Sequence, residues 1–165
     1  MKIIIKNILV AVLFLGLFSC ESDYGMFNSD NRPLIPVTFA NATTFGFDPY
    51  IEVSNSGPGD IQFVLQIPEN TGRSIREITR VSAGATALNA GSINTAGTYI
   101  VNPIPGDGNQ VVFNTTLAEF RQLRPNVTST PPEDGGFTEL AFFFLVTLDN
   151  GEEIVTMRAR VRVTE

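Results

Sequence analysis

The stretch from residue 139 to residue 163 restricts the fold more than any other part of the chain, because a long apolar strand pattern and a second, alternating one flank a tight turn. The turn sequence is Asn150-Gly151, which two-residue hairpin turns favour since both central residues need a positive φ, and it pairs residues whose numbers sum to 301. One face is then apolar, with Leu140 opposite Val161, Phe142 opposite Ala159, Phe144 opposite Met157 and Val146 opposite Val155. The other face pairs Glu139 with Arg162, Ala141 with Arg160, Phe143 with Arg158 and Leu145 with Thr156. A slip of one residue would bury the arginines, so both faces predict the same register.

Shorter strands are predicted from residue 33 onward, separated by turns rich in Gly, Pro and Asn. They cover residues 36–40, 45–47 with 50–53, 60–67, 75–81, 98–101 and 110–113. Within 60–67, large apolar residues occupy every second position, which is the period of a strand with one buried face.

One helix is predicted between the last short strand and the hairpin. Thr116 and Glu119 have the spacing of a capping box, in which the threonine hydroxyl accepts from the Glu119 amide and the carboxylate returns to the Thr116 amide. Phe120 and Leu123 follow on one face, and Pro125 ends the helix after about two turns.

These elements predict an all-β domain in residues 33–165. Seven or eight short strands, one short helix between strands and a long final hairpin are typical of an immunoglobulin-like antiparallel β-sandwich. A length of 165 residues suits one such domain preceded by other segments.

The N-terminus has the pattern of a secretory leader. Lys2 and Lys6 precede an apolar run of residues 8–18, which is shorter than the roughly 20 residues that span a hydrocarbon core. The run ends in Leu17-Phe18-Ser19-Cys20, and Cys20 is the single cysteine of the chain.

Leu17, Ser19 and Cys20 resemble the lipobox of bacterial lipoproteins. The resemblance implies that the Cys20 thiol takes a diacylglycerol, that the leader is cut before it, and that the freed amine is acylated, for example with palmitate. Residues 1–19 are then a lipoprotein signal peptide and residues 20–32 a lipidated flexible tether. The alternative is an ordinary leader followed by an unmodified cysteine.

The tether and the domain also resemble those of lipoproteins from Bacteroidota. Glu21 and Asp23 are similar to the acidic export signal of their surface lipoproteins, although a solvated linker explains the same residues. The spacing of the predicted strands in residues 33–165, and the sequence Leu-Asp-Asn-Gly-Glu-Glu at 148–153 before the last strand, resemble those of small immunoglobulin-like domains that accompany glycan-uptake systems. The resemblance implies an outer-membrane anchor, on the cell surface or the periplasmic face, and a binding or assembly module with an envelope protein partner or a glycan.

The amino-acid composition disfavours several classes of function. The chain has no His, which removes the commonest general base and every metal site that needs imidazole, so we expect neither an enzyme nor a cofactor. Leader removal leaves nine Arg against 17 Asp and Glu, a net charge of −8 compared with −6 for the whole chain. Such an acidic protein is not expected to bind nucleic acid.

Arg158, Arg160 and Arg162 alternate along the last strand and so share one face. Their forked donors could form a stripe that captures an acidic polysaccharide or a lipid headgroup. The alternative is a structural face, in which Arg162 pairs with Glu139 and Arg158 lies over the ring of Phe143.

Phe143 and Leu145 lie on the face opposite the core in the predicted register. Two apolar residues there indicate either a covered strand or a contact surface. For glycan stacking, the aromatic segment 45–50 is the best candidate, although its residues also suit a strand edge.

Overall fold

The computed structural model describes residues 33–44, 48–95 and 99–165. The predicted signal peptide, tether and Cys20, together with residues 45–47 of the aromatic segment, lie outside the described residues. No helix within the described ranges is long and apolar enough to cross a membrane.

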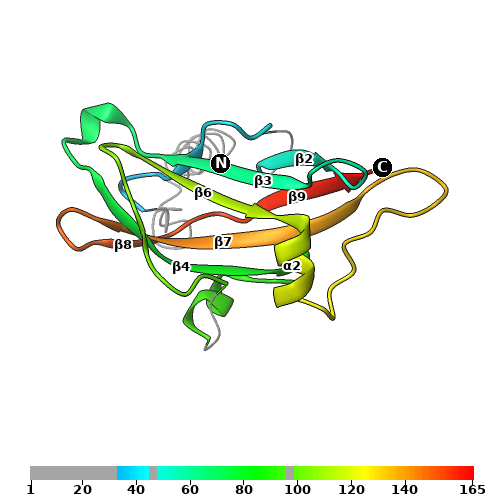
Figure 1. Cartoon of the computed structure of the whole chain (residues 1–165). Coiled ribbons are helices and arrows are strands. Elements are labelled where there is room, and N and C mark those ends of the chain that lie inside the picture. Colours follow the sequence, from blue (N-terminus) through cyan, green and yellow to red (C-terminus); the bar gives the residue numbers. More distant parts are fainter. Residues whose placement is uncertain (1–32, 45–47, 96–98) are drawn as a thin grey trace, which may run out of the picture. The chain divides into compact units, whose positions relative to one another are not determined.

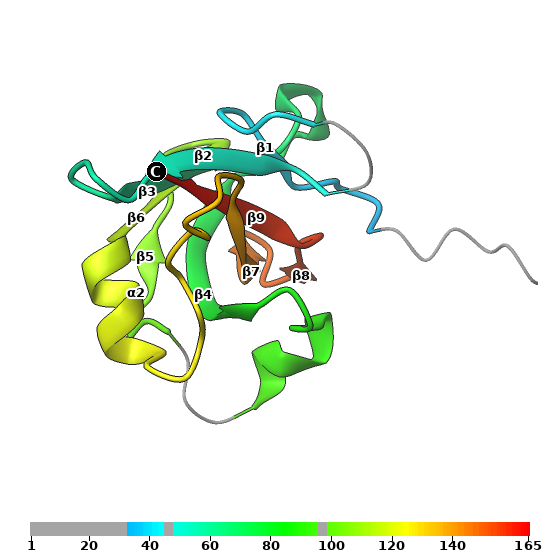
Figure 2. The same cartoon turned by 90° about the vertical axis from the view of Figure 1, so that its right-hand side faces the viewer.

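The described domain is a β-sandwich of two sheets (Figures 1 and 2). The smaller sheet has the order β1 (Thr38–Phe39), β3 (Asp60–Gln66) and β6 (Gln110–Thr116), and its strands are antiparallel. The larger sheet has the order β2 (Tyr50–Ser54), β9 (Ala159–Thr164), β7 (Thr138–Leu148), β4 (Ile75–Ala85) and β5 (Ile104–Pro105), with β8 (Glu153–Val155) also beside β7. β2 and β9 are parallel. The connections contain the helix α2 (Leu117–Leu123) and the 3-10 helices η1 (Glu69–Thr71) and η2 (Ala90–Asn94).

Aromatic rings fill the space between the sheets. Alternate residues of β3, β6 and β7 point inward, as their period of two predicts, and Phe63, Phe113, Phe142 and Phe144 are fully buried. Their ring centroids lie 5.2 to 6.3 Å apart in edge-on, tilted or stacked pairs. Such pairs add to the stabilisation that comes from burial alone.

The final hairpin turns through three residues and not through the two that we predicted. The Leu148 N–H donates to the Glu152 carbonyl (2.9 Å) and the Gly151 N–H donates to the Leu148 carbonyl (3.0 Å). Gly151 has φ 86°, whereas no described non-glycine residue has a positive φ, so Asn150 does not take the predicted conformation. The loop 149–151 therefore has the three-residue form in which a left-handed glycine closes the turn.

The longer loop changes the register near the turn but not at the far end of the hairpin. β8 pairs Leu145 with Val155 and Val146 with Ile154, so the predicted partners Thr156 and Val155 were wrong there. β9 then returns to the predicted pairs, which confirms Leu140 with Val161, Phe142 with Ala159, Glu139 with Arg162 and Ala141 with Arg160.

An extra residue between β8 and β9 restores the predicted register. The Thr156 N–H donates to the Phe144 carbonyl (2.9 Å), and Met157 turns outward with 54% of its surface exposed. The predicted pairs of Phe144 with Met157 and Phe143 with Arg158 therefore do not form. One residue more on one strand than on its partner is a β-bulge, which bends the strand.

Several other strands differ in extent from the prediction. β1 covers only two of the predicted residues 36–40, and β6 continues to Thr116, beyond the predicted end at residue 113. β4 continues to Ala85, beyond the predicted end at residue 81. Described residues 99–101 are not a strand; the Tyr99 N–H donates to the Val81 carbonyl (2.7 Å) and its ring enters the core, while the short strand β5 follows at Ile104–Pro105.

The helix α2 forms where the capping signal predicts it. The Thr116 hydroxyl accepts from the Glu119 N–H (3.1 Å), and the helix ends at Leu123. The Glu119 carboxylate instead accepts from the Thr115 hydroxyl (2.8 Å). Because that hydroxyl has one proton, the Tyr99 hydroxyl donates to Thr115 (2.8 Å), which links the helix to the core.

Because the Tyr99 phenol is buried, we expect the free energy of unfolding to fall at alkaline pH. Burial raises the pKa of Tyr99 above its ordinary value of 10.0. The unfolded chain releases the proton first, so the free energy of unfolding should be unaffected below pH 10 and should fall as the pH rises from 10 toward the folded-state pKa. Urea titrations between pH 8 and pH 11 should show this fall in the native protein and in Tyr50→Phe, but a smaller one in Tyr99→Phe. An equal fall in all three would contradict the assignment to Tyr99.

Candidate functional site

The arginine stripe (Arg158, Arg160 and Arg162) meets two carboxylates within the domain. Glu139 on β7 accepts from Arg160 Nη1 through both oxygens (3.0 and 3.1 Å) and from Arg162 Nε (3.0 Å). The predicted pair of Glu139 with Arg162 is thereby confirmed. Adjacent outward residues of β9 share this acid because the register places Glu139 opposite Arg162 and beside Arg160.

Asp48, just before β2, is the second carboxylate. It accepts from Arg158 Nε (2.8 Å) and Nη2 (2.6 Å), and it lies 3.7 Å from Arg160 Nε. Arg158 also donates to the Thr86 carbonyl (2.6 Å). Arg158 thus binds Asp48 and Thr86 where we had predicted a contact with Phe143.

Arg162 completes the network by stacking. Its guanidinium carbon lies 3.7 Å from the ring centroid of Tyr50 and 4.6 Å from that of Phe137. Tyr50, the described aromatic residue of the segment 45–50, is therefore already in contact with a cation. All three arginines of the stripe have partners inside the domain, and their side chains are only 34%, 17% and 20% exposed in chain order.

This network predicts a stability effect at its shared acid. Glu139→Gln removes the charge that serves both Arg160 and Arg162, so we expect the free energy of unfolding to fall by about 1 to 3 kcal/mol, between the values for exposed and buried pairs. Urea titration measures the change. The exposed Glu153, on β8, provides the control, since Glu153→Gln should change it by less than about 0.5 kcal/mol. Equal effects at the two positions would show that the network adds no stability.

Phe143 lies beneath a cover and not at an open surface. Phe143 and Leu145 are each 7% exposed and form a small apolar cluster with Ile93 of η2, against which Leu88 and Val155 pack. Of the two alternatives for Phe143 and Leu145, the structure therefore shows the covered strand and not the contact surface.

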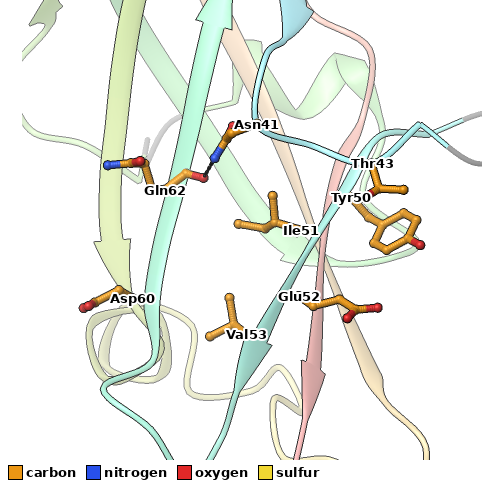
Figure 3. Close-up of a pocket in the computed structure, with 8 residues that line it drawn as sticks. All are labelled: Asn41, Thr43, Tyr50, Ile51, Glu52, Val53, Asp60 and Gln62. Atoms are coloured by element: carbon orange, nitrogen blue, oxygen red, sulfur yellow. Dashed lines mark hydrogen bonds between the residues drawn. The ribbon is translucent and has the colours of Figure 1, made fainter.

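A hollow of about 460 Å³ opens where an edge of each sheet meets the other (Figure 3). We call it the β2–β3 seam. It is lined by residues from β2, from β3 and from the segment between β1 and β2: Asn41, Thr43, Tyr50, Ile51, Glu52, Val53, Asp60 and Gln62.

One wall of the seam is an unpaired edge of β3. The Leu117 N–H donates to the Gly59 carbonyl, so the backbone groups of Ile61 and Phe63, at two-residue intervals, also point to β6. Those of Asp60 and Gln62 point the other way, toward the seam. β1 pairs only with Leu65 and Gln66, so no strand of the described chain lies beside Asp60 and Gln62.

The side chain of Asn41 closes part of this edge. Its Nδ2 donates to the Gln62 carbonyl (2.8 Å), and its Oδ1 accepts from the Val64 N–H (2.9 Å), in line with the bond from the Ala40 N–H to the Val64 carbonyl (2.8 Å). The carboxamide thus takes the place of the next peptide group of β1. The Gln62 N–H and both backbone groups of Asp60 still face the seam.

β2 forms the other wall. The Arg160 N–H donates to the Pro49 carbonyl, and the Asn55 N–H donates to the Thr164 carbonyl. The backbone groups of the odd-numbered residues from 49 to 55 therefore point to β9. The backbone groups of Tyr50 point away from β9 and form two hydrogen bonds with the backbone of Thr43 (2.8 and 2.9 Å). Glu52 also faces away from β9, and its backbone groups point to the seam.

The side chains give the seam an apolar floor and acidic rims. Figure 3 shows Ile51 and Val53 pointing between the strands, while Asp60 and Gln62 turn to one side and Tyr50 and Glu52 to the other. Glu52 and Asp60 are the charged residues of the lining. Neither carboxylate takes part in an ion pair within the described part of the chain.

Sequence reasoning did not find the seam. It depends on β1 stopping after two residues and on β2 joining the opposite sheet, and neither follows from strand periodicity. The chain matches no protein-family model, and no curated protein matches it.

Proposed function

We propose that the protein is a lipoprotein of the bacterial outer membrane, anchored through Cys20, whose immunoglobulin-like domain acts as a non-enzymatic binding or assembly module of the envelope. The observation that carries the binding role is the β2–β3 seam. It is hollow, both of its walls present unpaired backbone groups, and its acids have no partners in the described domain. A glycan-uptake complex is the setting that the sequence resemblance favours.

The strand order supports an immunoglobulin-like assignment within the β-sandwich. Immunoglobulin domains place their strands A, B and E in one sheet and C, F and G in the other. In chain order β1, β3 and β6 correspond to the first set, and β4, β7 and β9 to the second. The short helix α2 then lies between strands E and F.

The alternative role, capture of an acidic ligand by the arginine stripe, has less support. An acidic polysaccharide or headgroup would have to displace Asp48 and Glu139 from guanidinium groups that they already bind. We therefore place the binding surface at the seam.

Photo-crosslinking in the cells that produce the protein tests the binding role. A photoreactive phenylalanine at Gln62, an exposed residue of the seam lining, should give an adduct of higher mass with an envelope component. The same residue at Asn150, exposed in the hairpin turn, is the matched control and should give none. Free monomer at both positions, or equal adducts at both, would contradict binding at the seam.

A further inference from the structure

We infer that the seam takes an extended peptide segment of a partner protein, which adds to β3 as an antiparallel strand beside Asp60 and Gln62, with basic residues facing outward and apolar residues facing inward. The inference rests on the proposed binding role and names the class of partner.

The backbone determines the mode of binding. The Gln62 N–H and the N–H and carbonyl of Asp60 form a short row of ladder groups at the spacing of a strand edge. Extended peptides bind such edges through main-chain hydrogen bonds and gain specificity from pockets for alternate side chains. Both existing neighbours of β3 are antiparallel to it, so an antiparallel addition continues the pattern of the sheet.

The side chains determine the chemistry of the peptide. Residues opposite each other in an antiparallel pair share a face, so the residue beside Asp60 lies on the outer face, where the unpaired carboxylate favours Lys or Arg. Its neighbours in the peptide point inward over Ile51 and Val53, which favour apolar side chains. Glu52, on the other rim, adds a second negative charge, and the described residues that line the seam include no cation.

Other occupants fit less well. A second copy of the domain paired through the same edge would bring the carboxylates of Glu52 and Asp60 from both copies together, and like charges repel each other. A metal ion would need converging oxygens, yet the Glu52 and Asp60 side chains turn to opposite sides of the seam.

Binding of synthetic peptides to the full chain in detergent micelles tests the inference. The probe is a fluorescent octapeptide of alternating Val and Lys, with a Val and Glu octapeptide as control, and fluorescence anisotropy gives the affinity. We expect the basic peptide to bind at least tenfold more tightly than the acidic one. Equal affinities, or no binding of the basic peptide, would overturn the inference.

N-methylation separates strand addition from a general charge effect. In an antiparallel addition the outward Lys residues carry the backbone N–H groups that face β3. Methylating the backbone amide nitrogens of the Lys residues should therefore abolish binding, and methylating those of the Val residues should preserve it. Hydrogen exchange of the Gln62 amide should slow when the peptide binds, whereas that of Ile61, already directed to β6, should not change. Equal binding by the two methylated peptides, or the reverse preference, would overturn the proposed pairing.

A charge variant tests the outer contact. Asp60→Asn should weaken the basic peptide about two- to fivefold, as expected for an exposed ion pair, while Asp149→Asn in the hairpin loop should not. Equal effects would contradict a contact at Asp60. An in-cell adduct at Gln62 without peptide binding would overturn this inference alone, whereas peptide binding without any adduct would contradict the proposed role in the envelope.

Discussion

Cys20→Ala is expected to abolish lipid attachment completely, because alanine has no thiol to form the thioether with diacylglycerol. One acyl chain gives only marginal membrane binding and more than one gives stable anchoring. In the proposed lipoprotein every acyl chain is attached to Cys20, so its replacement should remove the whole anchor. Metabolic labelling with radioactive palmitate should give a labelled band for the native protein and none for the variant.

Ser19→Ala is the matched control for this experiment. It keeps a small residue before the cleavage point and leaves Cys20 in place, so the label should be retained. Protease treatment of intact cells that make the native protein then distinguishes the cell surface, where the domain is digested, from the periplasmic face, where it is protected. Label on Cys20→Ala, or its absence from the native protein, would contradict the lipoprotein proposal.

Phe142→Ala is expected to have the largest effect on stability. The ring is fully buried, and its centroid lies between 5.7 and 6.3 Å from those of Phe63, Tyr99, Phe113, Phe120 and Phe144. Its removal leaves a cavity where both sheets and α2 meet, so the free energy of unfolding should fall by about 3 to 5 kcal/mol. Because domains of this size are stable by only about 5 to 15 kcal/mol, the variant should be marginally folded.

Urea titration measures this loss, with Phe137→Ala as the control. Phe137 is 48% exposed and contacts Arg162 from the outside, so its removal should cost about 1 kcal/mol or less. Similar losses for the two variants would mean that the aromatic cluster is not the core of the domain.

Local signals predicted their elements well. The cap of α2 involves residues three apart, and the alternation of β3 is visible within seven residues. The hairpin register was correct at Leu140 and Phe142 because both faces of the strand constrain it there. It was wrong near the turn because the extra residue of the loop is compensated only by the bulge at Met157, which no local signal marks.

Contacts between distant residues could not be predicted in the same way. Glu139 was identified as a partner of Arg162 because the hairpin makes them cross-strand neighbours. Asp48 was not, because it reaches Arg158 only after β2 joins the larger sheet beside β9, and the sequence separation is 110 residues. The seam also depends on β2 joining the larger sheet, because it forms between β2 and the edge of β3 in the smaller sheet.

The position of β9 has a consequence for the order of folding. The last strand lies inside the larger sheet, between β2 and β7, so its residues must be present before β2 can join that sheet. A chain that is still being synthesised cannot complete this sheet, and pairing between such distant segments is intrinsically slow. The larger sheet should therefore remain incomplete until the final residues of the chain have been synthesised.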